Sequence, residues 1–318
     1  MSRSATHAGS WYLGNKSKLD KQLDQFLDAV PLSGPDYTSL PVTGARFLVG
    51  PHAGYAYAGK TLAETYKAWD IQGIKRVFIL GPSHHVYFHG ANLSKFSTYE
   101  TPLGNVPVDV ETTKKLYETG IFDYMSEQID EEEHSFEMHM PFIYKMTHQS
   151  SEGVRPIVPI LVCGTNSSYD KKLAQVLAPY FREKENAFVV SSDFCHWGRR
   201  FEYTTYVDDS SLQGLRTLTR VSKIGDNPIY KAIEYLDRRG MAVASFGSYE
   251  KWKSYLDLTD NTICGRTPLG VLLKAVENTS DGQGAGYGKL KWIGYAQSSK
   301  VTSVNDSSVS YASGFAVC

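Results

Sequence analysis

The 318-residue chain is poor in cysteine, has no long apolar run and carries almost no net charge. Its four cysteines are scattered and form no Cys-x-x-Cys pair, so we expect neither a disulfide scaffold nor a structural zinc site. The apolar runs fall far short of the roughly 20 residues of a membrane span, and the residues from Met1 to Thr6 open no hydrophobic signal region. With 33 basic against 34 acidic residues and no basic stripe, nucleic acid is not an expected partner. We expect a cytoplasmic protein that also reaches the nucleus.

Short apolar runs that alternate with helical patterns predict an α/β fold, with a central parallel or mixed sheet flanked by helices. The runs at 47–49, 76–80, 157–162 and 187–190 are rich in β-branched or aromatic residues, as buried parallel strands are. Helices are predicted before, between and after them, at 19–30, 60–69, 110–119, 171–181, 228–236 and 268–276.

Two further strands are predicted near the C-terminus, at 290–295 and 308–317. The second alternates only weakly, which indicates a solvent-facing or edge strand. Pro159 likewise suits an edge strand better than a central one. Because no repeat or long linker interrupts the chain, residues 1–318 are predicted to form one domain.

Three loops that follow predicted strands carry histidine. They are Gly50-Pro51-His52-Ala53-Gly54-Tyr55, Gly81-Pro82-Ser83-His84-His85 and Ser191-Ser192-Asp193-Phe194-Cys195-His196-Trp197. Ligands of open α/β sheets bind at the carboxyl ends of strands, where these loops converge. Since histidine is the commonest metal ligand, the pattern predicts a metal site or a site of acid–base chemistry.

Two imidazoles alone rarely fix a catalytic transition metal, so a third, anionic ligand is needed. The candidates are Cys264, Asp193, Cys195 and the carboxylates between Glu131 and His139. If that last segment is helical, His134 and Glu137 share a face and His139 points elsewhere.

Eight blocks of sequence, spread in order over nearly the whole chain, together carry a specific resemblance. They are His7 to Tyr12, Pro51 to Tyr55, Ile79 to His85, Glu133 to Pro141, Ser191 to Gly198, Asn261 to Arg266, Tyr295 to Ser299 and Asp306 to Tyr311. These blocks resemble the Memo family, the mediators of cell motility. The chain looks like a eukaryotic member, and we take it to be a fungal one.

The resemblance implies a fold similar to LigB-type class III extradiol dioxygenases, which hold non-haem iron(II) with two histidines and a glutamate. Memo proteins have a cysteine in place of the glutamate. Matched by motif, the metal ligands are His52, His84 and Cys264, and His196 is the neighbouring acid–base histidine. We take Asp193, His134 and Glu137 as further catalytic candidates.

The resemblance also implies a function, because family members are linked to iron or copper, to redox and metal balance, and to motility or invasive growth. A thiolate favours copper, zinc or a redox-labile iron, which makes ordinary dioxygenase activity doubtful. Our first hypothesis is a copper or iron protein that reduces oxygen, with superoxide as the product.

Two alternatives stay open at this point. The pocket could instead be a non-enzymatic adaptor site for a phosphotyrosine-type peptide of a signalling partner, with Arg199, Arg200 and Arg266 pairing with the phosphate. A third hypothesis is a hydrolase with Cys264 as nucleophile and His196 as base.

Overall fold

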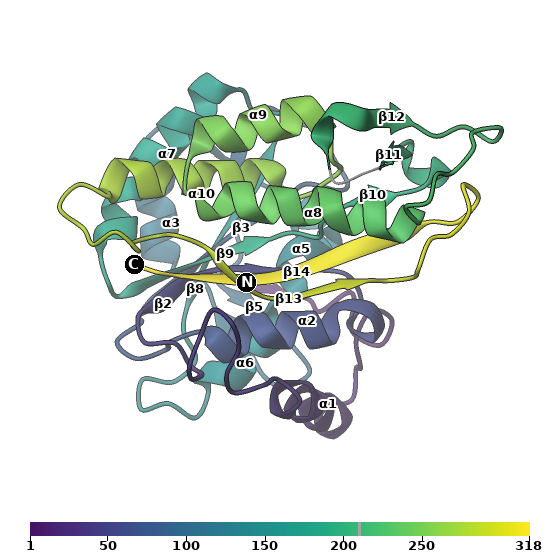
Figure 1. Ribbon diagram of the computed structural model, residues 1–318. Helices are drawn as coiled ribbons and strands as arrows, with labels where there is room; N and C mark the ends of the chain where they lie inside the picture. The colour runs from purple at the N-terminus through teal and green to yellow at the C-terminus, as the bar shows by residue number, and fades with distance from the viewer. Residues whose placement is uncertain (209–210) are drawn as a thin grey trace.

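A computed structural model describes residues 1–208 and 211–318, and its central element is a mixed nine-stranded sheet (Figure 1). Four parallel strands form its middle, in the spatial order β2 (Ala45–Gly50), β9 (Asn186–Ser191), β3 (Arg76–Pro82) and β8 (Ile157–Cys163). Helices cover both faces of these strands, which is why the runs are apolar throughout.

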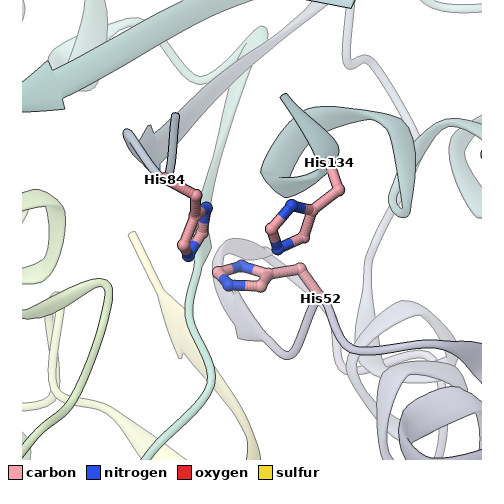
Figure 2. Close-up of side chains that lie close together, drawn as sticks. All are labelled: His52, His84 and His134. Atoms are coloured by element: carbon pink, nitrogen blue, oxygen red, sulfur yellow. The ribbon is translucent and has the colours of Figure 1, made fainter. Parts of the chain in front are cut away.

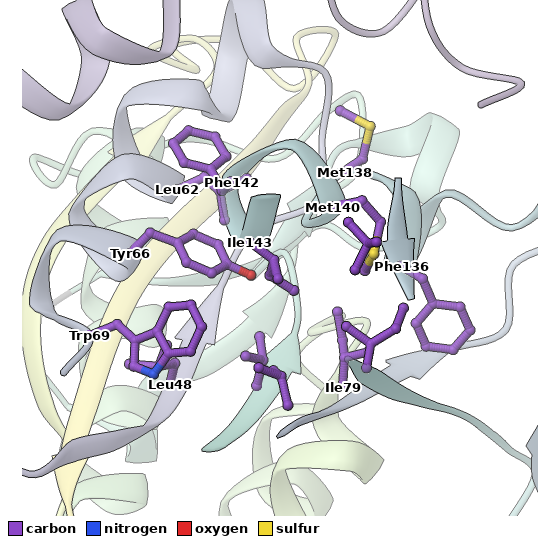
Figure 3. Close-up of a cluster of buried hydrophobic side chains, with 14 of the residues drawn as sticks. Leu48, Leu62, Tyr66, Trp69, Ile79, Phe136, Met138, Met140, Phe142 and Ile143 are labelled. Atoms are coloured by element: carbon purple, nitrogen blue, oxygen red, sulfur yellow. The ribbon is translucent and has the colours of Figure 1, made fainter. Parts of the chain in front are cut away.

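The two faces of the sheet bury separate sets of side chains. Along β3, Val77 and Ile79 pack on one face, whereas Phe78 and Leu80 pack on the other. Figure 3 shows part of the first core, in which Leu48 and Ile79 of the sheet lie near Leu62, Tyr66 and Phe142 of the covering helices.

Helices α1 (Lys16–Asp28), α2 (Tyr55–Ala68) and α6 (Met140–Thr147) lie below the sheet in Figure 1. Above it lie α7 (Ser167–Arg182), α8 (Ile229–Ser245), α9 (Tyr249–Thr259) and α10 (Arg266–Thr279). The shorter helices are α3 (Val110–Tyr117), α4 (Glu127–Glu132), α5 (His134–Glu137) and two 3₁₀ turns, η1 (Arg199–Phe201) and η2 (Leu212–Gly214).

Other strands extend the sheet on both sides. β4 (Gly90–Leu93) and β7 (Phe122–Tyr124) follow β8, and β14 (Ser308–Val317), β13 (Lys291–Gln297) and β10 (His196–Trp197) follow β2. Two small sheets lie apart from it. They consist of β1 (Ser2–Arg3), β5 (Thr98–Tyr99) and β6 (Val106–Pro107), and of β11 (Thr205–Val207) and β12 (Leu215–Thr217).

The predicted α/β fold is confirmed, with helices on both faces of a mixed sheet. No helix in the described part of the chain is long and apolar enough to cross a membrane.

The edge position predicted for residues 308–317 is wrong, because β14 lies between β2 and β13 and most of it is buried. Its polar residues misled the prediction, since they have hydrogen-bond partners inside the protein. Ser310 Oγ lies 3.2 Å from the Tyr295 hydroxyl, and Ser313 donates a hydrogen bond to Glu64.

The edge position predicted from Pro159 is also wrong, because β8 lies between β3 and β4. β4 pairs with β8 only from Ile160 onward, so Pro159 stands just before the ladder that these two strands share. The missing N–H of proline therefore disrupts no β4–β8 pairing.

Candidate metal centre

Three histidines from separate loops converge at the carboxyl end of the parallel strands. His52 follows β2, His84 follows β3 and His134 begins α5, and Figure 2 shows their rings turned toward one another. One ring nitrogen from each lies within 4.8 Å of the others. Of these three, His52 and His84 are predicted metal ligands and His134 a predicted catalytic residue. We call the three the histidine trio.

The orientation of His52 depends on Ser191 at the end of β9. The buried His52 ring places Nδ1 2.7 Å from Ser191 Oγ and Nε2 3.2 Å from Cys264 Sγ. Ser191 Oγ also donates to the carbonyl of Ser135 at 2.6 Å and lies 3.0 Å from Nε2 of the buried His139. The side chain of Ser191 therefore has three hydrogen-bond partners, and whether each can donate or accept determines where the protons lie.

The proton positions follow from the groups that can only donate or only accept. The Ser135 carbonyl can only accept and takes the Ser191 proton, so His139 must donate Nε2–H to Ser191 Oγ. The Tyr66 hydroxyl, 2.8 Å from His139 Nδ1, then donates to that unprotonated nitrogen. Burial lowers the pKa of His139 to about 3, so the ring is neutral. The Ser191 proton goes to the Ser135 carbonyl, and the remaining lone pair accepts from His52 Nδ1–H. Nε2 of His52 is thus left with a lone pair for a ligand.

His84 is held in the matching way by a carboxylate. The buried Glu133 accepts both the backbone N–H and the Nδ1–H of His84, each at 2.8 Å. Burial alone raises the pKa of Glu133, but the hydrogen bond and charge of His84 outweigh it and lower the pKa to about 2. A carboxylate behind a histidine fixes the tautomer that offers Nε2 to a metal.

His134 completes the trio by ring packing. Its ring stacks on His84 with a centroid distance of 4.2 Å and lies 4.5 Å from the ring of Trp11. Burial and the neighbouring His84 lower the pKa of His134 to about 3. Burial, followed by the charges of the other histidines, likewise lowers the pKa of His52. Neutral imidazoles are the form that binds metals.

Cys264 lies beside the trio, on the loop before α10. Its Sγ is 3.2 Å from His52 Nε2 and accepts the backbone N–H of Asp193 at 3.1 Å. Burial and then the charge of Asp193 raise the pKa of this thiol well above its usual value. The loop is closely packed, because a Cβ at Gly265 would lie 2.4 Å from Cβ of Ser192. Cys264 therefore contacts His52, but its Sγ is not one of the three donor atoms that lie within 4.8 Å of one another.

The predicted catalytic residues Asp193 and His196 flank this loop. Asp193 is buried and accepts the backbone N–H groups of His52 and Ala53, at 2.9 and 3.3 Å, so it holds the loop that carries His52. Nδ1 of His196 donates to the carbonyls of Phe194 and Thr262, which leaves Nε2 as a proton acceptor.

The structure places Glu137, also a predicted catalytic residue, away from the trio. It accepts hydrogen bonds from Arg3, from Tyr12 and from both the backbone and the ring of His7. Burial raises the pKa of Glu137, but the bond from His7 and the charge of Arg3 outweigh it, and the pKa falls to about 2. Glu137 therefore anchors the N-terminal segment.

Sequence reasoning missed Ser191 and His7 as parts of this site, and it considered Glu133 only as a direct metal ligand, not as the partner of His84. Glu133 directly precedes His134, and Ser191 begins the block that carries His196, so both lay inside segments already singled out. Their roles depend on contacts with residues far away in the sequence, which spacing alone does not reveal.

The donors fit a first-row transition metal. Two imidazoles are held with Nε2 lone pairs available, and a third imidazole and a thiol stand beside them. Nitrogen and sulfur donors suit copper, iron and zinc better than magnesium or calcium.

A sequence model of Memo-like proteins matches residues 3–315. The chain belongs to the Memo family. This Memo-family protein is 41% identical to the MEMO1 family protein MHO1 of Saccharomyces cerevisiae, over 98% of both chains. It is 40% identical to MEMO1 family protein C4H3.04c of Schizosaccharomyces pombe, over 99% of this chain and 98% of that one. Protein MEMO1 of Xenopus laevis is 42% identical over 98% of this chain and 96% of its own. The predicted family is confirmed, and these two fungal relatives and the Xenopus protein are similar to this chain to nearly the same degree.

Among solved structures, an uncharacterized Escherichia coli protein aligns with 84% of this Memo-family chain and 99% of its own. The sequence identity of this alignment is 15% and its TM-score is 0.47.

Proposed function

We propose that the protein binds a copper or iron ion at His52 and His84, with Cys264 as the thiolate donor and His134 as the neighbouring imidazole, and that it acts in cellular redox and metal balance. The observation that carries this proposal is a pair of hydrogen bonds to the Nδ1 atoms of the ligand histidines. Ser191 binds Nδ1 of His52, and Glu133 binds Nδ1 of His84. Each fixes a proton on Nδ1 and turns Nε2 inward, an arrangement typical of metal-ligating histidines.

The thiol of Cys264 supports copper or iron over the harder metals. With Nε2 of His52 unprotonated, the S–H of Cys264 has two acceptors within reach, this nitrogen at 3.2 Å and the carbonyl of Asp193 at 3.4 Å. Metal binding would release this proton and leave a soft thiolate donor. The ion would supply one-electron chemistry with dioxygen, for which superoxide is the expected product. Nε2 of His196 would hold a proton nearby.

Because the chain belongs to the Memo family, we also propose a role in signalling for motility or invasive growth. The hydrolase hypothesis finds no support in the geometry. The imidazole in contact with Cys264 is His52 and not His196, and burial keeps the thiol protonated, whereas a nucleophile needs a lowered pKa.

The ligand set can be tested by anaerobic loading with copper(I) or zinc, comparing the wild type with Cys264→Ser and His84→Ala. We expect His84→Ala to lose both metals, because it removes a core ligand. Cys264→Ser should weaken copper(I) at least about tenfold and zinc less, since copper(I) is the softer ion and depends more on the thiolate than zinc does. Unchanged copper(I) affinity in Cys264→Ser would contradict the assignment of the thiolate.

A second candidate function is the binding of a phosphotyrosine-type peptide. A groove of about 560 Å³ beside the His52 loop is lined by Trp11, Tyr57, Tyr311 and Arg200, which suits an aromatic ring with a negative charge. Of the three arginines in the adaptor hypothesis, only Arg200 lines this groove. Arg199 and Arg266 line two other hollows.

This second function predicts that Arg200→Gln weakens binding of a phosphotyrosine peptide at least about tenfold, because a charge-assisted bond is lost. Arg266→Gln is the matched control and should bind as the wild type does. Fluorescence anisotropy with phosphorylated and unphosphorylated peptide measures the difference. Equal binding of both peptides by the wild type would refute the adaptor function.

A further inference from the structure

Next to the histidine trio lies an open hollow whose walls are acidic and imidazole-bearing. It is lined by Thr6, His7, His85, Glu127, Gln128, Glu131 and Glu132. No lysine or arginine is among these lining residues, so its potential favours cations. The carboxylates come from α4, and the histidines come from the N-terminal segment and from the loop after β3.

His7 is held in the same way as the proposed ligand His84. Its backbone N–H donates to one oxygen of Glu137 and its ring Nδ1 lies against the other, each at 2.8 Å. His84 makes the same two contacts with Glu133, also at 2.8 Å. The carboxylate of Glu137 fixes the orientation of the His7 ring and leaves the lone pair of Nε2 available to a metal ion. Carboxylates hold metal-ligating histidines in the same way.

The hollow is connected to the trio through His134. The ring of His134 lies 5.9 Å from the ring of His7 and 6.2 Å from that of His85, and it stacks on His84 at 4.2 Å. An ion held by His7 and His85 would therefore lie next to His134, a member of the trio.

We propose that this hollow is a second, weaker site for a divalent transition-metal ion, with His7, His85 and the carboxylates of Glu127 and Glu131 as donors. Imidazole and carboxylate together suit zinc, iron(II) or copper(II). The site is weaker because, among the residues that the structure describes, only the trio brings three donor atoms within 4.8 Å of one another. Rotation of the exposed His85 and Glu127 side chains would be needed to bring their donor atoms to the ion. A role in passing ions to the trio rests on the proposed function, whereas binding in the hollow does not.

The test is a calorimetric titration of the whole protein with zinc, which has no redox chemistry to confuse the result. We expect the wild type to bind a tight and a weak equivalent. The double variant His85→Ala/Glu127→Gln should lose at least about tenfold in affinity at the weak step and keep the tight one. Both residues are exposed, so folding should not depend on them. His7→Gln should weaken the same step.

The matched control is His89→Gln, which changes an exposed histidine that does not line the hollow. It should leave both steps unchanged. A single binding step in the wild type, or a weak step that survives the double variant, would overturn this inference. Failure of the proposed function would look different, because the tight step would be absent or would survive His84→Ala.

Discussion

A single hydroxyl determines the form of His52 in this protein. The Ser191 hydroxyl accepts hydrogen bonds from the rings of His52 and His139 and donates one to the Ser135 carbonyl. A side chain without this oxygen would leave all three buried groups unsatisfied, which is costly in free energy. Ser191 therefore acts on the metal site through the proton of His52.

We predict that Ser191→Ala weakens metal binding by about 10- to 100-fold, the usual effect of removing the hydrogen-bond partner of a metal-ligating histidine. The free energy of unfolding should fall by about 2 kcal/mol or more, because buried polar groups lose their partners. Competition with a chelator measures the affinity, and nitrogen NMR shifts of the histidines report whether His52 still carries its proton on Nδ1.

Tyr66→Phe is the control for this prediction, because it removes a bond of the same network without touching Ser191 or His52. It should reduce metal affinity far less than Ser191→Ala does. Equal effects of the two variants would show that Ser191 acts only through general stability.

Among helices and strands, α8 is joined to the site by one buried carboxylate. Oδ1 of Asp237 accepts the N–H of Cys195 at 3.2 Å and the side-chain amide of Asn261 at 3.0 Å, and Oδ2 accepts the hydroxyl of Tyr295 at 2.8 Å. Cys195 directly precedes His196, Asn261 lies shortly before Cys264 in the sequence, and Tyr295 is on β13. Burial, which outweighs the hydrogen bonds, raises the pKa of Asp237 to about 6.

This carboxylate predicts a pH dependence of stability. The pKa of Asp237 in the folded protein exceeds the value of about 3.9 for an unfolded chain. Its contribution is therefore fully present below about pH 4 and is lost as the pH rises through 6, by up to roughly 3 kcal/mol for a shift of this size. Asp237→Asn should unfold in urea with a flatter dependence on pH between 4 and 7.

Asp257→Asn, a change at an exposed carboxylate, is the control and should keep the slope of the wild type. If Asp237→Asn showed that same slope, Asp237 would not be the group that titrates.

Sequence patterns predicted the elements whose burial is uniform. The middle strands are continuously apolar because helices cover both faces, so their positions were predictable to within a few residues. β14 was misplaced at an edge, because its buried serines look like solvent-facing residues until their partners are known.

Across the complete chain, the site draws on segments that no local pattern connects. His52 and His84 were predictable because each follows a strand, whereas Cys264 was one of several candidates until the family resemblance selected it. The buried Arg3 bonds Asp130 and Glu137, which brings His7 and Trp11 to the trio from the first residues of the chain. Such contacts depend on the tertiary fold, so the sequence alone could not place them.

The most direct test of the proposed function is the metal content per chain after anaerobic incubation with iron(II) or copper(I) and removal of loosely held ions. We predict one retained ion per wild-type chain and none in His52→Ala, since this change removes the ligand whose Nε2 faces the site. A wild-type chain that retains neither metal, or a His52→Ala chain that retains as much as the wild type, would contradict the metal centre described above.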